Sequence, residues 1–242
     1  MNATSKYEFT IIVPLYNEAD NIYMLEKRLA DYLPKCPVKA CVLFVNDGST
    51  DTSQEKLVEI CSRNEAFYRI DFETNCGLSA ALAAGFEKVQ SPLCGYMDAD
   101  LQTAPEDFDV LLAKIPDFSM VTGIRTGRRD SALKRIQSKV ANNFRRMMTR
   151  DGAIDTGCPL KVLRTDIAKR LPMFKGMHRF IPALVLMLGG TYAQIPVRHF
   201  PRTAGTSKFG LRGRLFGPLA DCFAYRWMKK RYVKCTIHSS NL

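Results

Sequence analysis

The chain has 242 residues, of which 46% are hydrophobic and 24% charged, values typical of a globular protein with a sizeable core. Its first residues lack a basic stretch followed by an apolar one. Its longest apolar run, Phe180 to Gly190, is about half of the ~20 residues that a membrane-spanning helix needs. We therefore expect neither a signal peptide nor an integral membrane protein.

The formal net charge of +11 is distributed unevenly along the chain. Residues 1–124 contain 10 Lys/Arg and 19 Asp/Glu, whereas residues 125–242 contain 25 and 5. An acidic half that suits a cation therefore precedes a basic half that suits nucleic acid, an anionic membrane or a phosphorylated substrate. The eight cysteines form no CxxC pair and the three histidines are scattered, so we expect reduced cysteines of an intracellular protein and no zinc site.

The first hundred residues alternate between apolar, β-branched runs and segments with apolar residues at helical spacing. The expected strands are 9–13, 41–45, 68–72 and 94–97, and the expected helices are 21–33, 52–64 and 78–89. Continuously apolar strands that alternate with helices predict an α/β protein with a mostly parallel sheet covered by helices on both faces.

Polar turns follow three of these strands, beginning at Pro14, Asn46 and Asp98. Ligands of parallel sheets bind at the carboxyl ends of the strands, where all three turns are expected to meet. If 94–97 and the residues after it are extended, Asp98 and Asp100 point to one side, and Gln102 continues the pattern. Two carboxylates and an amide oxygen suit Mg²⁺ or Mn²⁺, with phosphate oxygens completing the coordination.

A solvated acidic turn before a helix is the alternative interpretation of this stretch. Thr103 and Glu106 have the spacing of a capping box, in which the two side chains satisfy the free N–H groups of a helix start. Part of the acidic stretch is therefore expected to begin a helix.

The basic half begins with an expected strand at 119–123, followed by Arg125 and a helix at 131–149. One face of this helix is apolar and another is polar or basic. The apolar positions are Leu133, Ile136, Val140, Phe144 and Met147, and the polar ones are Lys134, Ser138, Asn142 and Arg145. A buried helix at 180–188, with Pro182 in its first turn, and a last strand at 192–197 follow.

The C-terminal segment has large apolar residues at every fourth position, flanked by Arg and Lys. These apolar residues are Leu211, Leu215, Leu219, Phe223 and Trp227. Gly217-Pro218 is expected to divide the segment into two helices. The pattern fits either a basic amphipathic helix on a membrane surface or an ordinary packing helix.

Four motifs in order, each after an expected strand, resemble glycosyltransferase family 2 with the GT-A fold. They are Pro14-x-Tyr16-Asn17-Glu18, Asn46-Asp47-Gly48-Ser49-x-Asp51, Asn75-x-Gly77 and Asp98-Ala99-Asp100-Leu101-Gln102. The resemblance implies that the nucleoside of a sugar donor is bound by Pro14, Tyr16, Glu18 and Asp47. It further implies that Asp98 and Asp100, assisted by Gln102, bind a divalent metal and the diphosphate.

The basic half is similar to the polyprenyl-phosphate subgroup of this family, which includes dolichol-phosphate mannose synthases. This resemblance implies that the acceptor phosphate is bound by Arg125, Lys134, Arg135, Ser138 and Arg202. Lys134 stands where several relatives have Arg. The stretch Arg202-x-x-Gly205-x-Ser207-Lys208 matches the subgroup's loop, so Arg202 and Lys208 are expected to bridge donor diphosphate and acceptor phosphate. The stretch 155–160 resembles the subgroup's strand that closes the floor of the site, and we assign no chemical role to its residues.

The resemblance implies a Rossmann-like GT-A catalytic domain at residues 1–208. The amphipathic pattern of the basic segment at 209–242 predicts contact with a membrane surface or a membrane-protein partner. The expected activity is inverting, Mg²⁺- or Mn²⁺-dependent transfer of a sugar from a UDP- or GDP-sugar to undecaprenyl or dolichyl phosphate, at the cytoplasmic face of a membrane. A phosphate acceptor is already ionised at neutral pH and needs no general base.

Three other functions are weighed against this one. A hydroxyl acceptor needs a carboxylate base, and the acids of the second half stand in no recognisable motif. These acids are Asp130, Asp151, Asp155, Asp166 and Asp221. Nucleic-acid binding lacks a recognisable motif. A nucleotide-sugar-binding subunit without activity does not explain the intact stretch 98–102.

Overall fold

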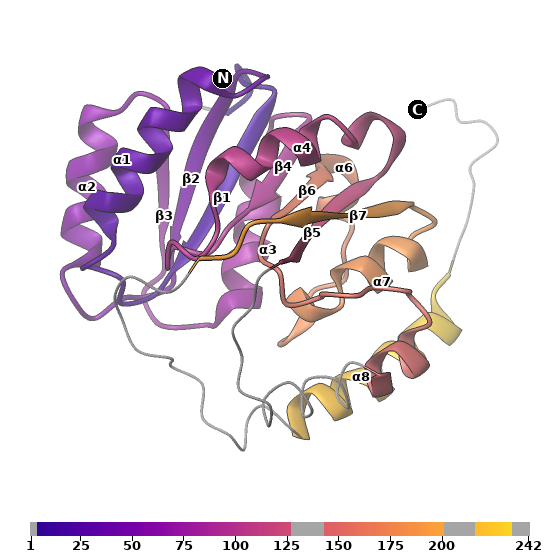
Figure 1. Cartoon of the computed structure of the whole chain (residues 1–242). Coiled ribbons are helices and arrows are strands. Elements are labelled where there is room, and N and C mark those ends of the chain that lie inside the picture. The colour runs from indigo at the N-terminus through magenta and orange to yellow at the C-terminus, as the bar shows by residue number, and fades with distance from the viewer. Residues whose placement is uncertain (1–3, 127–142, 201–215, 234–242) are drawn as a thin grey trace, which may run out of the picture.

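A computed structural model describes residues 4–126, 143–200 and 216–233 (Figure 1). These residues contain a seven-stranded sheet in the order β3-β2-β1-β4-β6-β5-β7. The strands are β1 Phe9–Leu15, β2 Ala40–Asn46, β3 Phe67–Asp71, β4 Leu93–Tyr96, β5 Met120–Arg125, β6 Lys161–Arg164 and β7 Tyr192–Val197. Only β6, among the described strands, is antiparallel to its neighbours β4 and β5. The expected mostly parallel sheet is therefore confirmed.

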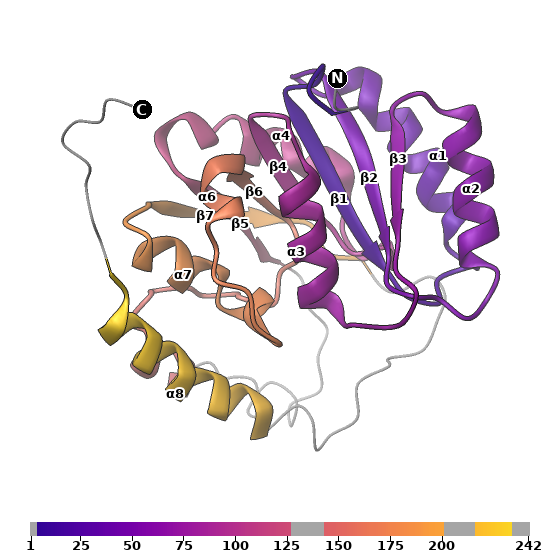
Figure 2. The same cartoon turned by 180° about the vertical axis from the view of Figure 1, so that it is seen from behind.

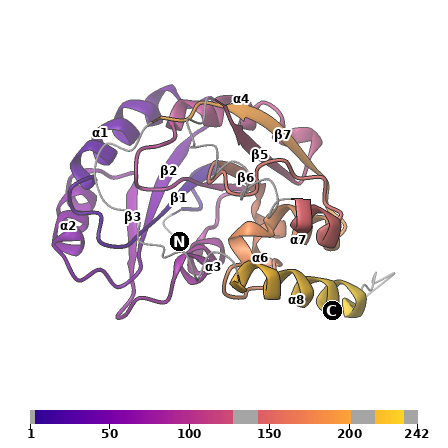
Figure 3. The same ribbon diagram turned by 60° about the horizontal axis from the view of Figure 1, so that its bottom comes forward.

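Helices cover both faces of this sheet. They are α1 Ile22–Tyr32, α2 Ser53–Arg63, α3 Leu78–Lys88, α4 Phe108–Leu112, α6 Thr165–Lys169, α7 Ile181–Met187 and α8 Phe216–Arg231. Short 3-10 helices are Leu33–Lys35, Pro105–Asp107, Ile115–Asp117 and Met177–Arg179. Figures 2 and 3 show α3, α6, α7 and α8 on the face opposite α1, α2 and α4. Each face of the sheet has its own hydrophobic core, and neighbouring residues of β1 point to opposite faces. Ile11 packs in the core with residues of α1 and α4, and Ile12 packs in the core with residues of α3 and α7.

Helix α3 packs closely on β1 because its residues are small. A Cβ placed on Gly85 would lie 2.8 Å from Cγ2 of Ile12, so a larger residue there would push the helix off the sheet. Ala81 and Leu82 are fully buried in the same contact. The small residues of this helix therefore allow its close approach to the sheet.

The expected capping box at Thr103 and Glu106 is wrong. The 3-10 helix starts at Pro105 with Ala104 at its N-cap, so Thr103 lies one residue too early to cap it. The Thr103 hydroxyl is buried without a hydrogen-bond partner. Asp107 instead binds Arg198 beyond β7, accepting from its backbone N–H at 2.8 Å and its Nε at 2.7 Å.

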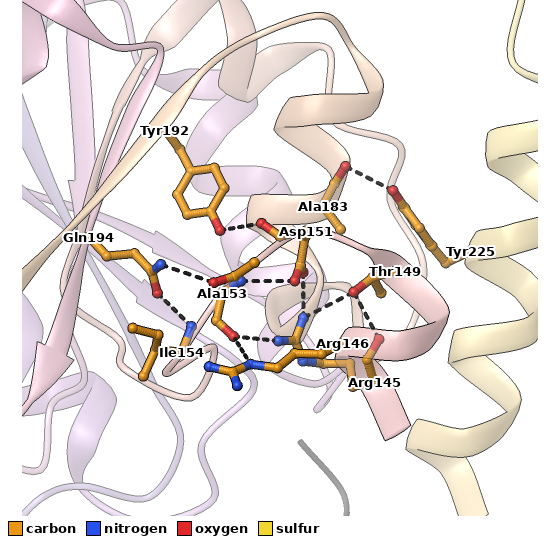
Figure 4. Close-up of polar contacts among 11 residues, drawn as sticks. Arg145, Arg146, Thr149, Asp151, Ala153, Ile154, Ala183, Tyr192, Gln194 and Tyr225 are labelled. Atoms are coloured by element: carbon orange, nitrogen blue, oxygen red, sulfur yellow. Dashed lines mark hydrogen bonds and ion pairs between the residues drawn. The ribbon is translucent and has the colours of Figure 1, made fainter. Parts of the chain in front are cut away.

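Of the helix expected at 131–149, residues 143–149 are described and are helical. The prediction that Arg145 lies on a polar or basic face of this helix is wrong. Arg145 is buried and forms an ion pair with Asp151, while Nη2 donates to the Ala153 carbonyl at 2.9 Å (Figure 4). Met147, expected on the apolar face, is exposed. A guanidinium can be buried when its donors meet a carboxylate and carbonyl oxygens, and here these come from residues beyond the helix end.

Residues 150–154 attach this segment to the sheet. The Tyr192 hydroxyl of β7 donates to the Asp151 carbonyl at 2.5 Å. Gln194 of the same strand accepts from the Ile154 N–H at 2.6 Å and donates to the Gly152 carbonyl at 3.3 Å (Figure 4). The Arg145–Asp151 pair is thus anchored from both the helix and the strand.

Helix α8 runs from Phe216 to Arg231, with Gly217-Pro218 in its first turn, where proline is tolerated. The other helix expected before Gly217-Pro218 would lie outside the described residues. The inner face of α8 packs as an ordinary helix. Cys222 and Tyr225 are buried, and the Tyr225 hydroxyl donates to the Ala183 carbonyl at 3.2 Å. The predicted domain boundary at 208/209 lies outside the described residues. Among the described residues, no helix has the length and apolar composition needed to cross a bilayer.

His178, in the 3-10 helix Met177–Arg179, contacts α3 within one core and makes the stability depend on pH. Its Nδ1 lies 3.1 Å from the Ser79 hydroxyl, and burial lowers its pKa to about 3 from the ordinary 6.5. The folded protein therefore keeps His178 neutral at pH values where the unfolded chain takes up a proton. We expect the free energy of unfolding to fall as the pH drops below 6.5 and to continue falling towards 3.

Urea denaturation of the wild type and of His178→Gln at several pH values between these limits tests this expectation. The stability difference between the two proteins should shrink as the pH falls, by up to about 1.4 kcal/mol per pH unit. Parallel stability curves for the two proteins would contradict it.

Candidate functional site

The carboxyl ends of β1, β2, β4 and β5 lie at one edge of the sheet, the lower edge in Figure 1. The predicted residues of the described chain follow these strand ends. They are Tyr16 and Glu18 after β1, Asp47 after β2, Asp98, Asp100 and Gln102 after β4, and Arg125 at the end of β5. Pro14 lies inside β1, opposite Val45 of β2. The parallel sheet therefore brings these motifs to a common edge.

The turns after β1 and β2 are hydrogen-bonded to each other. Asn17 has a positive φ of 51°, a conformation that Asn tolerates better than most residues. Its N–H donates to the Ser49 hydroxyl at 2.9 Å, and its Oδ1 accepts from the Thr50 N–H at 2.7 Å. The neighbouring Glu18 N–H donates to the Ser53 hydroxyl at 3.0 Å. These bonds fix the position of Glu18 relative to the turn that carries Asp47.

Asp47 is buried and holds the loop before α3. Its carboxylate accepts from the Cys76 N–H at 2.7 Å, from the Gly77 N–H at 2.8 Å and from Nδ2 of Asn75 at 3.0 Å. Gly48 follows with a φ of 64°, and a Cβ there would lie 2.3 Å from the Thr74 carbonyl carbon. Only glycine fits this position without strain. Two motifs that lie far apart in sequence therefore form one unit.

The acidic pair lies in a turn and not in a strand. Strand β4 ends at Tyr96, so the turn, rather than strand alternation as expected, positions Asp98 and Asp100. Asp98 is half-buried and Asp100 is buried. Oδ1 of Asp100 accepts from the Gln102 N–H at 3.2 Å, and the Gln102 carbonyl accepts from the Phe200 N–H at 2.9 Å. The segment after β7 thus lies beside this turn.

The donor set of this turn fits a divalent cation that completes its coordination with phosphate and water. Asp98, Asp100 and the Gln102 amide provide oxygens only, as Mg²⁺ and Mn²⁺ prefer. In the described part of the chain, no group of three or more His, Cys, Asp and Glu side chains could hold a metal by itself. The residues therefore suit a metal bound together with a diphosphate.

Arg125 forms an ion pair with Asp155, which lies on the loop before β6. Its backbone N–H and Nε donate to Oδ2 of Asp155 at 3.1 and 2.8 Å, and its Nη2 donates to Oδ1 at 2.8 Å. Burial alone would lower the pKa of Arg125 and raise that of Asp155. The bonds between the two groups outweigh burial, so the pKa of Arg125 is raised and that of Asp155 is lowered.

Two features of this ion pair bear on the site. The negative charge of Asp98 also raises the pKa of Arg125, so the cation lies within the field of the acidic turn. A Cβ on Gly157 would lie 2.8 Å from Nη2 of Arg125, so glycine leaves room for the guanidinium. The stretch 155–160, which had no assigned role, therefore positions Arg125 through Asp155 and Gly157.

Lys161 is a second cation at this edge, and the sequence reasoning missed it. It opens β6 opposite Tyr96 and is fully buried. Its Nζ donates to the Tyr96 hydroxyl at 3.1 Å and to the Cys158 carbonyl. Burial lowers the pKa of Lys161, while the charges of Asp155 and Asp98 oppose that shift. The available signal was a lysine placed in the apolar run Leu160 to Leu163.

Five predicted site residues cannot be placed, because Lys134, Arg135, Ser138, Arg202 and Lys208 lie outside the described residues. The chain before each of the two gaps is described. The Thr126 N–H donates to the Val197 carbonyl at 3.1 Å, and Phe200 is bonded to Gln102. Both segments therefore leave the described fold near the acidic turn or the end of β5.

Comparison with known proteins gives relatives for most of the chain. The family model of glycosyl transferase family 2 matches residues 10–171. Dodecaprenyl-phosphate galacturonate synthase of Rhizobium johnstonii is 31% identical over 220 residues, covering 88% of this chain and 65% of the relative. Undecaprenyl-phosphate 4-deoxy-4-formamido-L-arabinose transferase of Pseudomonas fluorescens is 33% identical over 202 residues, covering 83% and 59%. The chain thus spans about three fifths of the length of these relatives.

A similar fold occurs in glucosyl-3-phosphoglycerate synthase of Mycobacterium tuberculosis, solved with Mn²⁺, uridine diphosphate and glucosyl-3-phosphoglycerate. The TM-score is 0.67 at 12% identity, over 94% of this chain and 81% of that one. The expected GT-A fold is thereby confirmed. The match of the family model to residues 10–171, which include the polar turns after β1, β2 and β4, shows that the chain belongs to glycosyl transferase family 2.

Proposed function

We propose that this chain transfers a sugar from a nucleotide sugar to a polyprenyl phosphate, with inversion at the anomeric carbon and with Mg²⁺ or Mn²⁺ as cofactor. The observation that carries the proposal is the juxtaposition of the acidic turn with a cation. Arg125, held by Asp155, lies within the field of Asp98 at the same sheet edge. A metal–diphosphate and an acceptor phosphate can therefore be bound side by side.

The donor half of the site consists of the turns after β1, β2 and β4. In this proposal Pro14, Tyr16, Glu18 and Asp47 bind the nucleoside of a UDP- or GDP-sugar. Asp98 and Asp100, with Gln102, hold the metal and the diphosphate, as their oxygen-only donor set allows. The M. tuberculosis structure of the same fold contains Mn²⁺ and uridine diphosphate, which agrees with this assignment.

The acceptor half is basic. Arg125 binds the acceptor phosphate, together with Lys134, Arg135, Ser138 and Arg202, while Lys208 contacts the donor diphosphate. The printed names of the relatives support a polyprenyl phosphate, since they refer to dodecaprenyl and undecaprenyl phosphate. Such an acceptor is membrane-bound and the donor is soluble in water, so we place the reaction at the cytoplasmic face of a membrane.

In the proposed step, an oxygen of the acceptor phosphate attacks C1 of the sugar from the face opposite the leaving group. The bond from C1 to the donor diphosphate breaks, and its electron pair leaves with the nucleoside diphosphate. The bound divalent cation stabilises the charge that develops on this leaving group. Arg125 reduces the repulsion between the two phosphates, and Asp155 keeps the guanidinium oriented.

The acids of the second half argue against the alternative hydroxyl acceptor, which needs a base. Asp155 is engaged by Arg125 and its pKa is lowered, which makes it a weaker base. Asp151 is buried in its pair with Arg145, and Asp221 lies on α8. Asp166 is exposed on α6, and Asp130 lies outside the described residues. A phosphate acceptor requires no such base.

Asp100→Ala should lower sugar transfer by at least about 100-fold, because one of the two carboxylates that hold the metal is lost. Transfer is measured with purified protein in Mg²⁺ or Mn²⁺ and again after adding a chelator, which should also stop it. Asp117→Ala, which removes an exposed carboxylate before β5, is the matched control and should keep full activity. Near-normal turnover of Asp100→Ala would contradict the metal assignment.

Asp47→Asn should weaken nucleotide binding by roughly tenfold, which corresponds to about 1.4 kcal/mol. An amide has one acceptor oxygen and cannot satisfy the donors of Asn75, Cys76 and Gly77, so the loop before α3 loses its fixed position. Titration calorimetry with UDP and GDP measures the change, and Asp31→Asn on the exposed side of α1 is the control. Equal dissociation constants for Asp47→Asn and wild type would refute the assigned role.

The proposed reaction is tested by incubating the chain with undecaprenyl or dolichyl phosphate and a panel of UDP- and GDP-sugars. Mass spectrometry should detect a prenyl-phosphate sugar that forms only when lipid phosphate and a divalent metal are both present. Donor hydrolysis without a lipid product would point to the hydroxyl-acceptor alternative. Failure of every donor to bind would refute the enzyme assignment.

A further inference from the structure

The outer face of α8 exposes large apolar side chains to solvent. Leu219, Phe223 and Trp227, four residues apart, are 38%, 62% and 64% exposed. The ring of Phe223 lies 6.4 Å from that of Phe144, so the helical residues 143–149 lie beside α8. Met147 of this segment is 62% exposed. We call Met147, Leu219, Phe223 and Trp227 the outer apolar surface. Its size sets it apart from a single exposed side chain, which would need no explanation.

Cations accompany the outer apolar surface. Arg150, Arg226, Lys229 and Lys230 line a pocket of about 470 Å³ between α8 and residues 148–150, together with Trp227. The pocket residues contact one another, since Nη1 of Arg226 lies 3.6 Å from Sδ of Met148. The Arg231 guanidinium lies 5.4 Å from the Trp227 ring. Positive charge and aromatic rings are therefore interleaved on one surface.

The acidic residues of this region do not face the pocket. The one acid of α8, Asp221, lies against the backbone of Gly176, where a Cβ would come within 2.5 Å of its Oδ2, and Arg179 is close to it. Asp151 is buried in its pair with Arg145. The pocket lining contains no carboxylate among the described residues. Among the described residues, therefore, no carboxylate of the pocket lining offsets its positive charge.

We propose that the outer apolar surface docks on an anionic lipid bilayer. Phe223, Trp227 and Met147 enter the boundary between headgroups and acyl chains, and the basic pocket receives a lipid phosphate. A helix with cations beside exposed aromatic and aliphatic groups is typical of this mode of binding. Nucleic acid would use the cations but leave the aliphatic side chains in water. The inference deepens the proposed function, because the proposed acceptor lies in such a bilayer, but its test does not use sugar transfer.

Trp227 is the only tryptophan of the chain, so its fluorescence reports directly on docking. Full-length protein is mixed with vesicles of phosphatidylcholine alone or with roughly one third phosphatidylglycerol. We expect co-sedimentation and a blue shift of Trp227 emission with the anionic vesicles only, and loss of binding at high salt. Bilayers with brominated acyl chains should quench the emission, because the ring enters the acyl boundary.

Two variants test the two parts of the surface. Phe223→Ser and the charge reversal Lys229→Glu/Lys230→Glu should each weaken binding to the anionic vesicles by at least roughly tenfold. The controls are Met24→Ser and Lys27→Glu/Lys35→Glu, at exposed positions on or next to α1 at the opposite end of the molecule (Figure 1). These controls should bind like the wild type.

The proposal would be overturned by no binding to anionic vesicles, by equal binding to neutral ones, or by binding that the α8 variants leave unchanged. Salt-sensitive binding to DNA without binding to vesicles would also overturn it. The Asp100→Ala protein should still bind vesicles, so a failure of the proposed reaction and a failure of membrane docking are distinguishable.

Discussion

The site depends on opposite charges held together at the carboxyl edge of the sheet. Asp98, Asp100 and Asp155 would repel one another in this partly buried setting without nearby cations. Strands β5 and β6 supply the cations, with Arg125 bonded to Asp155 and Lys161 buried beneath the Tyr96 hydroxyl. Because β6 runs antiparallel, its first residue lies at the same edge as the last residues of β4 and β5. One reversed strand thus brings Lys161 within the field of Asp98 in the acidic turn.

Much of this architecture follows from the sequence, because the strands carry continuous apolar runs and the polar turns come directly after them. The position of Asp47 and Asp98 at the carboxyl edge of the sheet could be predicted from their motifs. The roles of Asp155 and Lys161 could not, because each depends on a partner on another strand, Arg125 for the first and Tyr96 for the second. Periodicity describes a residue's own element and contains no information on such pairs.

At Arg145 and Thr103, predictions from helical periodicity and from capping-box spacing fail because residues elsewhere in the chain determine the local structure. Helical periodicity placed Arg145 on a polar or basic face, but Asp151 and the Ala153 carbonyl, beyond the helix end, make burial of its charge possible. Thr103 has the right spacing for a capping box, but Pro105 starts the helix one residue too late for it. In α8 the described members of the four-residue repeat, Leu219, Phe223 and Trp227, form a stripe that faces solvent, while Tyr225 faces the core.

The position of α8 relative to the sheet relates the proposed membrane docking to the proposed sugar transfer. Helix α8 lies on the same side as the carboxyl ends of β1, β2 and β4, the lower side in Figures 1 and 2. A bilayer that contacts the outer apolar surface would therefore lie on the side where Arg125 and the acidic turn are found. A lipid phosphate is confined to the headgroup layer, so an enzyme that uses it must bring its site to that layer. Docking through α8 would do so while Cys222 and Tyr225 keep the helix attached to the fold.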